Sequence, residues 1–146
     1  TMPSGMVGPA LPEAIGSALD GSFGVLPGSD SDGADVFGAM AEENGFNAGV
    51  YAGEAYDAAA LILLAMQAAG STDPAAFSGK VMELANAPGE EIKPGQLAKA
   101  LEIVKGGGDI NYVGASAVEL IGPGESAGNF REIKIEDGEI KTVQYR

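Results

Sequence analysis

The chain has 146 residues, of which 45% are apolar, enough for an ordinary domain with a buried core and too many for a disordered segment. Its 21 acidic and 8 basic residues give a formal net charge of −13, a field that repels nucleic-acid phosphates and anionic lipid surfaces. The lack of cysteine and histidine excludes disulfides, thiolate metal sites and catalysis by Ser–His or Cys–His pairs.

The first part of the chain predicts two helices and one strand. Residues 1–8 are interrupted by proline and glycine and indicate a loop. A short helix is expected over Pro9–Leu19 and a strand over Ser22–Leu26. A second helix is expected over Ala34–Asn44, where Gly45 suits the position just after a helix end.

The clearest helical signal spans Glu54–Ala69. Apolar residues cover nearly its whole circumference, as is typical of a helix packed on several sides. We therefore expect it to be the most buried element, with Leu63 and Leu64 in the core. Its uncharged stretch is interrupted by Gln67 and is too short for a membrane span, which needs about 20 residues.

The second half changes from helices to strands. Helices are expected over Asp73–Ala85 and Gln96–Val104, with a break at Pro88-Gly89 between them. Asp137-Gly138 is a strong hairpin signal between two alternating segments. This order predicts an α/β fold with an added hairpin. The expected strands are Ile110–Val113, Ala117–Leu120, Phe130–Ile135 and Glu139–Tyr145.

Five short segments, spread over the whole chain, carry a family resemblance. They are Met2-Pro3-Ser4-Gly5-Met6, Ile15–Gly21, Tyr51 with Ala55-Tyr56-Asp57-Ala58, Ile110–Ser116, and Gly128-Asn129-Phe130 with Asp137-Gly138. In this order they are similar to the C-terminal part of a type I periplasmic solute-binding protein of the branched-chain amino acid (Leu/Ile/Val-binding) ABC-transporter family.

The resemblance implies an α/β fold that is the C-terminal portion of a two-lobed protein, with parallel sheets flanked by helices and a C-terminal β-hairpin. It assigns residues 1–48 to the second lobe and 49–113 to the first lobe. It assigns residues 114–146 to the hinge crossing and the last strands of the second lobe. Because 146 residues beginning with Thr1 are too few for a whole receptor, an N-terminal portion is expected to be missing from this sequence.

The resemblance also implies a function. We expect a non-enzymatic, periplasmic component of an ABC importer that binds a small solute, namely an amino acid, an amide or a small carboxylate. Its expected partners are that solute, a membrane permease and its own N-terminal portion. No cofactor, metal or nucleic acid is expected.

The resemblance points to three ligand-binding residues in the cleft between the lobes: Ser4, Gly5 and Tyr51. Amino-acid-binding members often carry an acidic residue in the loop that matches Met2–Met6, whereas this chain has Ser4. A neutral hydroxyl cannot make a charge-assisted hydrogen bond to an ammonium, so we expect a ligand whose recognition does not depend on one. Tyr51 stands where members place an aromatic residue against the ligand.

Each candidate has a structural alternative. Ser4 could be an ordinary turn serine, and Tyr51 could pack in the core with its hydroxyl at the surface. Asp57 is expected to cap or pair locally, and Tyr112 to pack in its strand. The stretch Asp30–Asp35 fails the spacing of a calcium-binding loop and indicates a helix N-terminus instead.

Two other function classes remain open. Paired carboxylates, Glu42-Glu43 or Glu90-Glu91, could do acid–base work in an enzyme fragment, although adjacent acidic residues are usually solvated. The same clamshell fold also serves as a ligand-sensing domain in regulators. An upstream signal peptide would favour the importer, and an upstream helix-turn-helix segment would favour the regulator.

Overall fold

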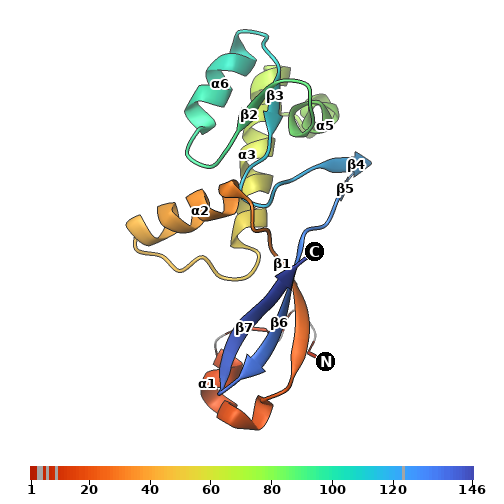
Figure 1. Ribbon diagram of the computed structural model, residues 1–146. Coiled ribbons are helices and arrows are strands. Elements are labelled where there is room, and N and C mark those ends of the chain that lie inside the picture. Colours follow the sequence, from red (N-terminus) through yellow and green to blue (C-terminus); the bar gives the residue numbers. More distant parts are fainter. Residues whose placement is uncertain (3–4, 6, 9, 123) are drawn as a thin grey trace.

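The computed structural model describes residues 1–2, 5, 7–8, 10–122 and 124–146. Figure 1 shows an elongated molecule with two bodies joined at a narrow waist. One body is helical and is built around α3 (Ala52–Ala69). The other is a small sheet with the short helix α1 (Ala10–Ile15) at its far end.

The sheet has three antiparallel strands in the order β1-β6-β7, namely β1 (Phe23–Pro27), β6 (Phe130–Glu136) and β7 (Glu139–Tyr145). The β6–β7 hairpin turns at Asp137 and Gly138, whose φ angles of 56° and 74° are those of a two-residue turn with left-handed central residues. The hairpin predicted from Asp137-Gly138 is therefore confirmed. Leu26, Ile133 and Ile135 are almost fully buried in this body.

The helical body packs short elements against one side of α3. Its core is apolar and includes residues from α3, α5, α6 and the parallel pair β2–β3. The elements besides α3 are α4 (Pro74–Phe77), the 3-10 turn η3 (Ser78–Lys80), α5 (Val81–Ala85), β2 (Glu90–Ile92), α6 (Leu97–Lys105), β3 (Ile110–Tyr112), β4 (Leu120–Gly122) and β5 (Glu125–Ser126).

Helix α3 lies close to the helix expected over Glu54–Ala69, but less of it is buried than the sequence led us to expect. Leu64 and Ala65 are fully buried, as predicted for Leu64, whereas Ile62 is 43% and Leu63 is 48% exposed. The prediction for Leu63 was wrong because the elements that pack on α3, including α4, α5 and α6, leave the side of the helix with Leu63 exposed. The buried positions 57, 60, 61, 64 and 65 follow the spacing of a single helix face.

Helix α2 (Asp32–Glu43) begins at Ser31, whose hydroxyl accepts a hydrogen bond from the Ala34 N–H at 3.2 Å. Its Phe37 ring lies 5.2 Å from the Tyr56 ring of α3. Lys93 forms an ion pair with Asp32 at 3.0 Å. These contacts join α2 to the helical body, although the resemblance assigns residues 1–48 to the other lobe. Where the lobes divide stays a prediction.

Two further elements differ from the sequence prediction. The helix expected over Asp73–Ala85 is divided into α4, η3 and α5. The strand β2, which the sequence did not predict, exists through parallel pairing of Glu90–Ile92 with β3. Within the described residues, no helix combines the length and the apolar character needed to cross a membrane.

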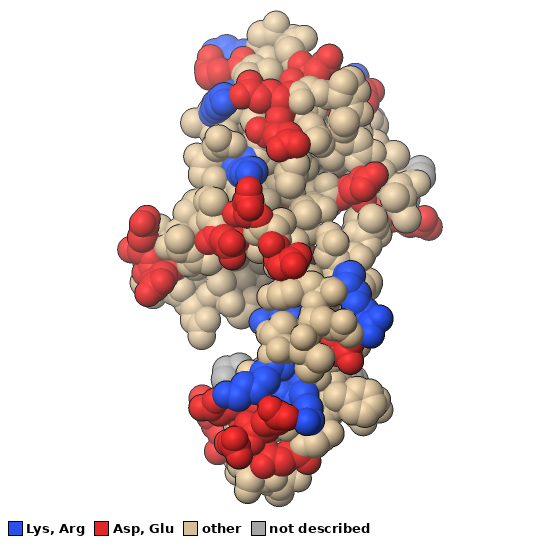
Figure 2. All heavy atoms as spheres, in the orientation of Figure 1, with Lys and Arg blue, Asp and Glu red and all other residues tan. Residues whose placement is uncertain are grey.

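Among the charged side chains, acidic ones outnumber basic ones, 21 to 8. On the face shown in Figure 2, red acidic atoms are spread over both bodies, and blue basic atoms lie among them. The excess of acidic atoms agrees with the formal net charge of −13.

Candidate ligand-binding cleft

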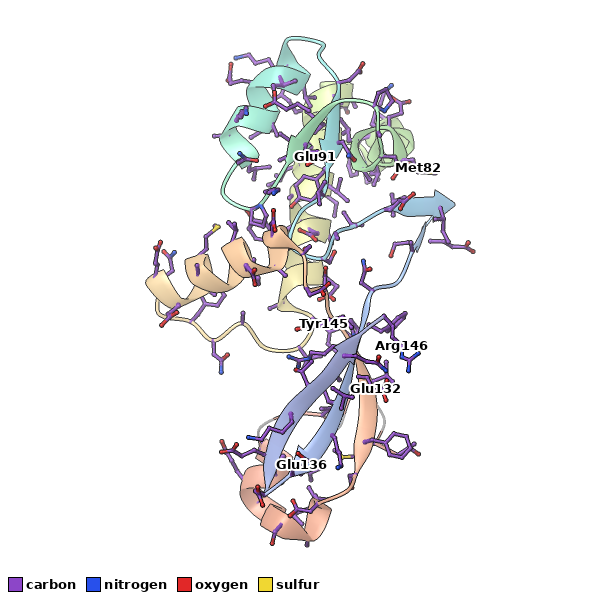
Figure 3. All side chains as sticks on the ribbon, viewed as in Figure 1. Met82, Glu91, Glu132, Glu136, Tyr145 and Arg146 are labelled. Carbon is purple, nitrogen blue, oxygen red and sulfur yellow. The ribbon has the colours of Figure 1, made fainter. Side chains whose placement is uncertain are left out.

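A cavity of about 380 Å³ lies where the two bodies meet, at the N-terminal end of α3. Figure 3 shows one of its lining residues, Tyr145, at the end of the hairpin nearest the helical body. Its walls come from the N-terminal loop, the end of β1, α2, the segment before α3 with the first turn of α3, the loop after β3, and the hairpin. Its lining residues with polar side chains are Ser29, Asn47, Tyr51, Glu54, Ser116, Arg131 and Tyr145.

Tyr51 lines this cavity and is 46% exposed, so the structure does not bury it in the core. It is the residue before α3 and has a left-handed backbone with φ of 68°. A non-glycine residue in this region is uncommon and is held there by its surroundings. Tyr51 is thus placed to contact a bound molecule, and its role in binding stays a prediction.

The N-terminal loop reaches the same cavity. Ser4 lies outside the described residues, and Gly5 is exposed but is not part of the cavity wall. Val7 and Gly8, which follow in the same loop, do line it. The structure thus brings the end of the predicted loop and Tyr51 to one cavity, while ligand binding by Ser4 and Gly5 stays a prediction.

Asp57 fixes one wall of the cavity. The residue lies in an apolar helix and is 2% exposed, and its carboxylate has partners far along the chain. It accepts hydrogen bonds from the Ala115 N–H at 2.8 Å, the Ser116 N–H at 2.7 Å, the Ser116 hydroxyl at 2.6 Å and the Tyr112 hydroxyl at 3.0 Å. The prediction that Asp57 caps or pairs locally was therefore wrong.

The loop after β3 fits this carboxylate closely. Gly114 has φ of +61°, and a Cβ atom there would lie 2.2 Å from Asp57 Oδ1, so only glycine is accommodated. Tyr112 is 1% exposed, as predicted for a packing residue. Burial raises the pKa of the Tyr112 hydroxyl, and the charge and hydrogen bond of Asp57 raise this pKa further.

Ala115 and Ser116 lie in the cavity wall because of this arrangement. The side-chain amide of Asn129 donates to the Ser116 carbonyl at 3.1 Å and so ties the same loop to the segment that enters β6. The Gly28 N–H donates to the Asn129 carbonyl at 3.1 Å. The chain crossings at the waist are therefore connected to one another by hydrogen bonds.

A larger cavity of about 740 Å³ lies along α3 and shares Glu54 and Ser116 with the first. Its wall is mainly apolar and includes Leu61, Ile62 and Met82. It contains neither Tyr51 nor the N-terminal loop. Both cavities have polar side chains in their walls, but the smaller one joins residues of both bodies, whereas the wall of the larger one comes from the helical body alone. Because small-solute sites are common where two parts of a protein meet, we favour the smaller cavity as the candidate site.

Sequence reasoning missed Ser116, Arg131 and Tyr145 as cavity residues. Arg131 and Tyr145 occupy adjacent strands of the hairpin, where they face each other in register. Nothing in the local alternation marks them as site residues. The sequence did contain one indication of the loop with Ser116: Asp57 is a single carboxylate inside an apolar helix, and a buried carboxylate needs hydrogen-bond donors from elsewhere in the chain.

No family model matches the chain. A 93-residue stretch, 63% of the chain and 22% of the relative, is 32% identical to the chemotactic signal transduction system substrate-binding protein BasB of Halobacterium salinarum. The crystal structure of the leucine-binding protein LivK from Thermotoga maritima is similar over 98% of this chain and 35% of its own, with a TM-score of 0.68 and 17% identity. The chain thus spans about a third of LivK and about a fifth of BasB. The likeness shows the fold, that of a type I periplasmic binding protein, with small and partly parallel sheets.

Proposed function

We propose that this protein binds a small solute of the amino acid, amide or small carboxylate class in the cavity at Tyr51. The observation that carries the proposal is the cavity itself. Its volume of about 380 Å³ suits a small molecule, and its wall combines polar side chains from both bodies. The proposal is also supported by the structural similarity to LivK and by the 32% sequence identity with BasB over 93 residues, since both are named as binding proteins.

The two bodies are proposed to act as parts of two lobes that close on the solute. The contacts of α2 with α3 favour a first crossing between β1 and α2. The contacts of β4 with α5 favour a second crossing between β5 and β6, after the position near residue 114 that the resemblance implies. Ser4, Gly5 and Tyr51 are proposed to contact the solute from opposite sides of the cleft. The rest of the pocket is proposed to come from an N-terminal portion of the same protein.

Within this proposal the protein is the substrate-binding component of an ABC importer, acts in the periplasm and delivers its solute to a membrane permease. It is not proposed to be an enzyme. The paired carboxylates Glu42-Glu43 and Glu90-Glu91 are all exposed, and none of the four lines the cavity.

A second candidate is a ligand-sensing protein that presents its solute to a receptor. The observation that favours this candidate is the partial sequence similarity to BasB, which is named as part of a chemotactic signal transduction system. The two candidates share the solute site and differ in the membrane partner. Deleting the gene separates them, since an importer component is needed for uptake of labelled solute and a sensor for the chemotactic response to it.

The binding function is tested by calorimetric titration of the protein, at the full length its gene encodes, with amino acids, their amides and small carboxylates. We expect tight binding of at least one of them. Binding should weaken in the Ser4→Ala and Tyr51→Ala variants. Tight binding that survives both substitutions would place the site elsewhere, and binding of no panel member would overturn the proposed function.

A further inference from the structure

Arg131 is the exception among the basic residues of this chain. Each of the other seven forms an ion pair with a carboxylate, and within the described residues Arg131 forms none. The seven pairs are Lys80–Glu83, Lys93–Asp32, Lys99–Glu90, Lys105–Glu102, Lys134–Glu136, Lys141–Glu139 and Arg146–Glu132.

The guanidinium of Arg131 is also incompletely satisfied. Its Nε atom is buried and has no hydrogen-bond partner in the part of the chain that the structure describes. A buried donor on a charged group that lacks a partner lowers the stability of the protein. Because Nε itself is covered, a partner from outside the folded chain would bind the terminal N–H groups of this guanidinium.

The position of Arg131 in the sheet shows which residues lie beside it. In the antiparallel sheet Arg131 stands opposite Leu26 on one side and Tyr145 on the other. Side chains of paired residues project from the same face of a sheet. Arg131 and Tyr145 both line the cavity that contains Tyr51, and Arg131 is the only basic residue among the cavity's described lining residues.

We infer that Arg131 binds the carboxylate of the solute. This inference rests on the proposed function and names the chemical group that the site recognises. A guanidinium presents a planar fork of N–H donors that matches a carboxylate in two parallel hydrogen bonds. The hydroxyls of Ser29, Ser116 and Tyr145 line the same cavity and offer further donors.

The second charged group of the cavity narrows the ligand class. Glu54 also lines the wall, so the lining includes one cationic and one anionic side chain among its described residues. A monocarboxylate whose remaining groups are neutral or cationic suits this charge balance. A dicarboxylate would bring a second negative charge into a cavity that already contains Glu54.

The experiment uses Arg131→Gln in the protein at its full gene-encoded length, with Arg146→Gln as the matched control. Gln keeps the first two side-chain carbons, and the Arg131 Cβ lies close to Gly28, so the packing there is preserved. Arg146 stands on the neighbouring strand, is exposed, and pairs with Glu132 outside the cavity lining. Each panel amino acid is titrated calorimetrically together with its own amide, which lacks the carboxylate charge.

We expect Arg131→Gln to weaken binding of the amino acid about tenfold or more, since hydrogen bonds between charged groups are the strong ones. Binding of the matching amide should change little, and Arg146→Gln should leave both affinities unchanged. An equal loss for amino acid and amide, or no loss for either, would overturn the inference while the proposed function stands.

A second measurement does not require a tight ligand. In nitrogen-15 NMR spectra of the full-length protein, the Nε–H signals of Arg131 and Arg146 can be assigned because each is lost in the corresponding Arg→Gln variant. Titration with leucine, leucinamide and 4-methylpentanoate should move the Arg131 signal with the two carboxylates alone. Equal shifts of both arginines, or an Arg131 signal that none of the carboxylates moves, would contradict the inference.

Discussion

The Tyr112 hydroxyl donates a hydrogen bond to Asp57 Oδ1 at 3.0 Å, across 55 residues of chain. Both side chains are almost fully buried, so this contact fixes β3 to the first turns of α3 from within the core. The same carboxylate receives the Ala115 and Ser116 N–H groups, and both residues line the candidate cavity. The shape of the cleft therefore depends on a carboxylate that is largely withdrawn from solvent.

The first prediction concerns that carboxylate. Replacing Asp57 by Asn keeps its size but removes the charge and turns a donor group toward N–H donors. We expect a loss of about 2 kcal/mol or more in the free energy of unfolding, measured by urea denaturation. Asp109→Asn, at an exposed position, is the control and should change this free energy by less than about 0.5 kcal/mol. Equal stability of the two variants would show that the Asp57 hydrogen bonds contribute little.

The second prediction follows from the raised pKa of Tyr112. An unfolded tyrosine ionises near pH 10, and the folded protein holds the Tyr112 proton to higher pH. The stabilisation is therefore fully present below about pH 10 and is lost as the pH rises above it. We expect the midpoint of thermal unfolding to fall above about pH 10.

The variant Tyr112→Phe separates this effect from general alkaline unfolding. It should lose about 1 kcal/mol of stability at pH 7, because the hydrogen bond to Asp57 is gone. Above about pH 10 its melting midpoint should fall less steeply than that of the unchanged protein. Parallel curves for the two proteins would exclude Tyr112 as the source of the pH dependence.

The third prediction uses two neighbouring leucines of α3. Leu64 is fully buried and Leu63 is 48% exposed. Leu64→Ala should cost about 2–5 kcal/mol of unfolding free energy, as expected for a buried leucine. Leu63→Ala should cost less than about 1 kcal/mol in the same assay, because little packing is lost. Similar costs at both positions would mean that the Leu63 face of α3 is covered in solution.

The fourth prediction concerns Tyr51. Because its φ is 68°, glycine suits its backbone better than any residue with a side chain. Tyr51→Gly should therefore retain or raise the melting midpoint while it weakens solute binding about three- to tenfold, through loss of the aromatic contact. Phe23→Ala, at another exposed aromatic outside the cavity lining, should leave the affinity unchanged. Unchanged affinity in Tyr51→Gly would remove Tyr51 from the site.

Some of this protein could be predicted from the sequence because the determining residues are close together in the chain. Asp137-Gly138 sets the turn of the β6–β7 hairpin, and the alternation on either side sets its strands. The long apolar run gives α3, and Gly70 ends it with a left-handed backbone. The α/β fold class follows from the order of these elements, and the likeness to LivK confirms it.

Other features were decided only by the tertiary structure. The one-sided burial of α3 depends on which elements pack against it, so periodicity could not separate Leu63 from Leu64. Strand β2 is paired with β3, which lies about 20 residues further along the chain. The folded chain brings distant segments together, so Asp57 accepts hydrogen bonds from Ala115 and Ser116. For the same reason Arg131 and Tyr51 line one cavity. Local propensity acts over a few residues, whereas hydrogen-bond and charge partners are chosen by proximity in space.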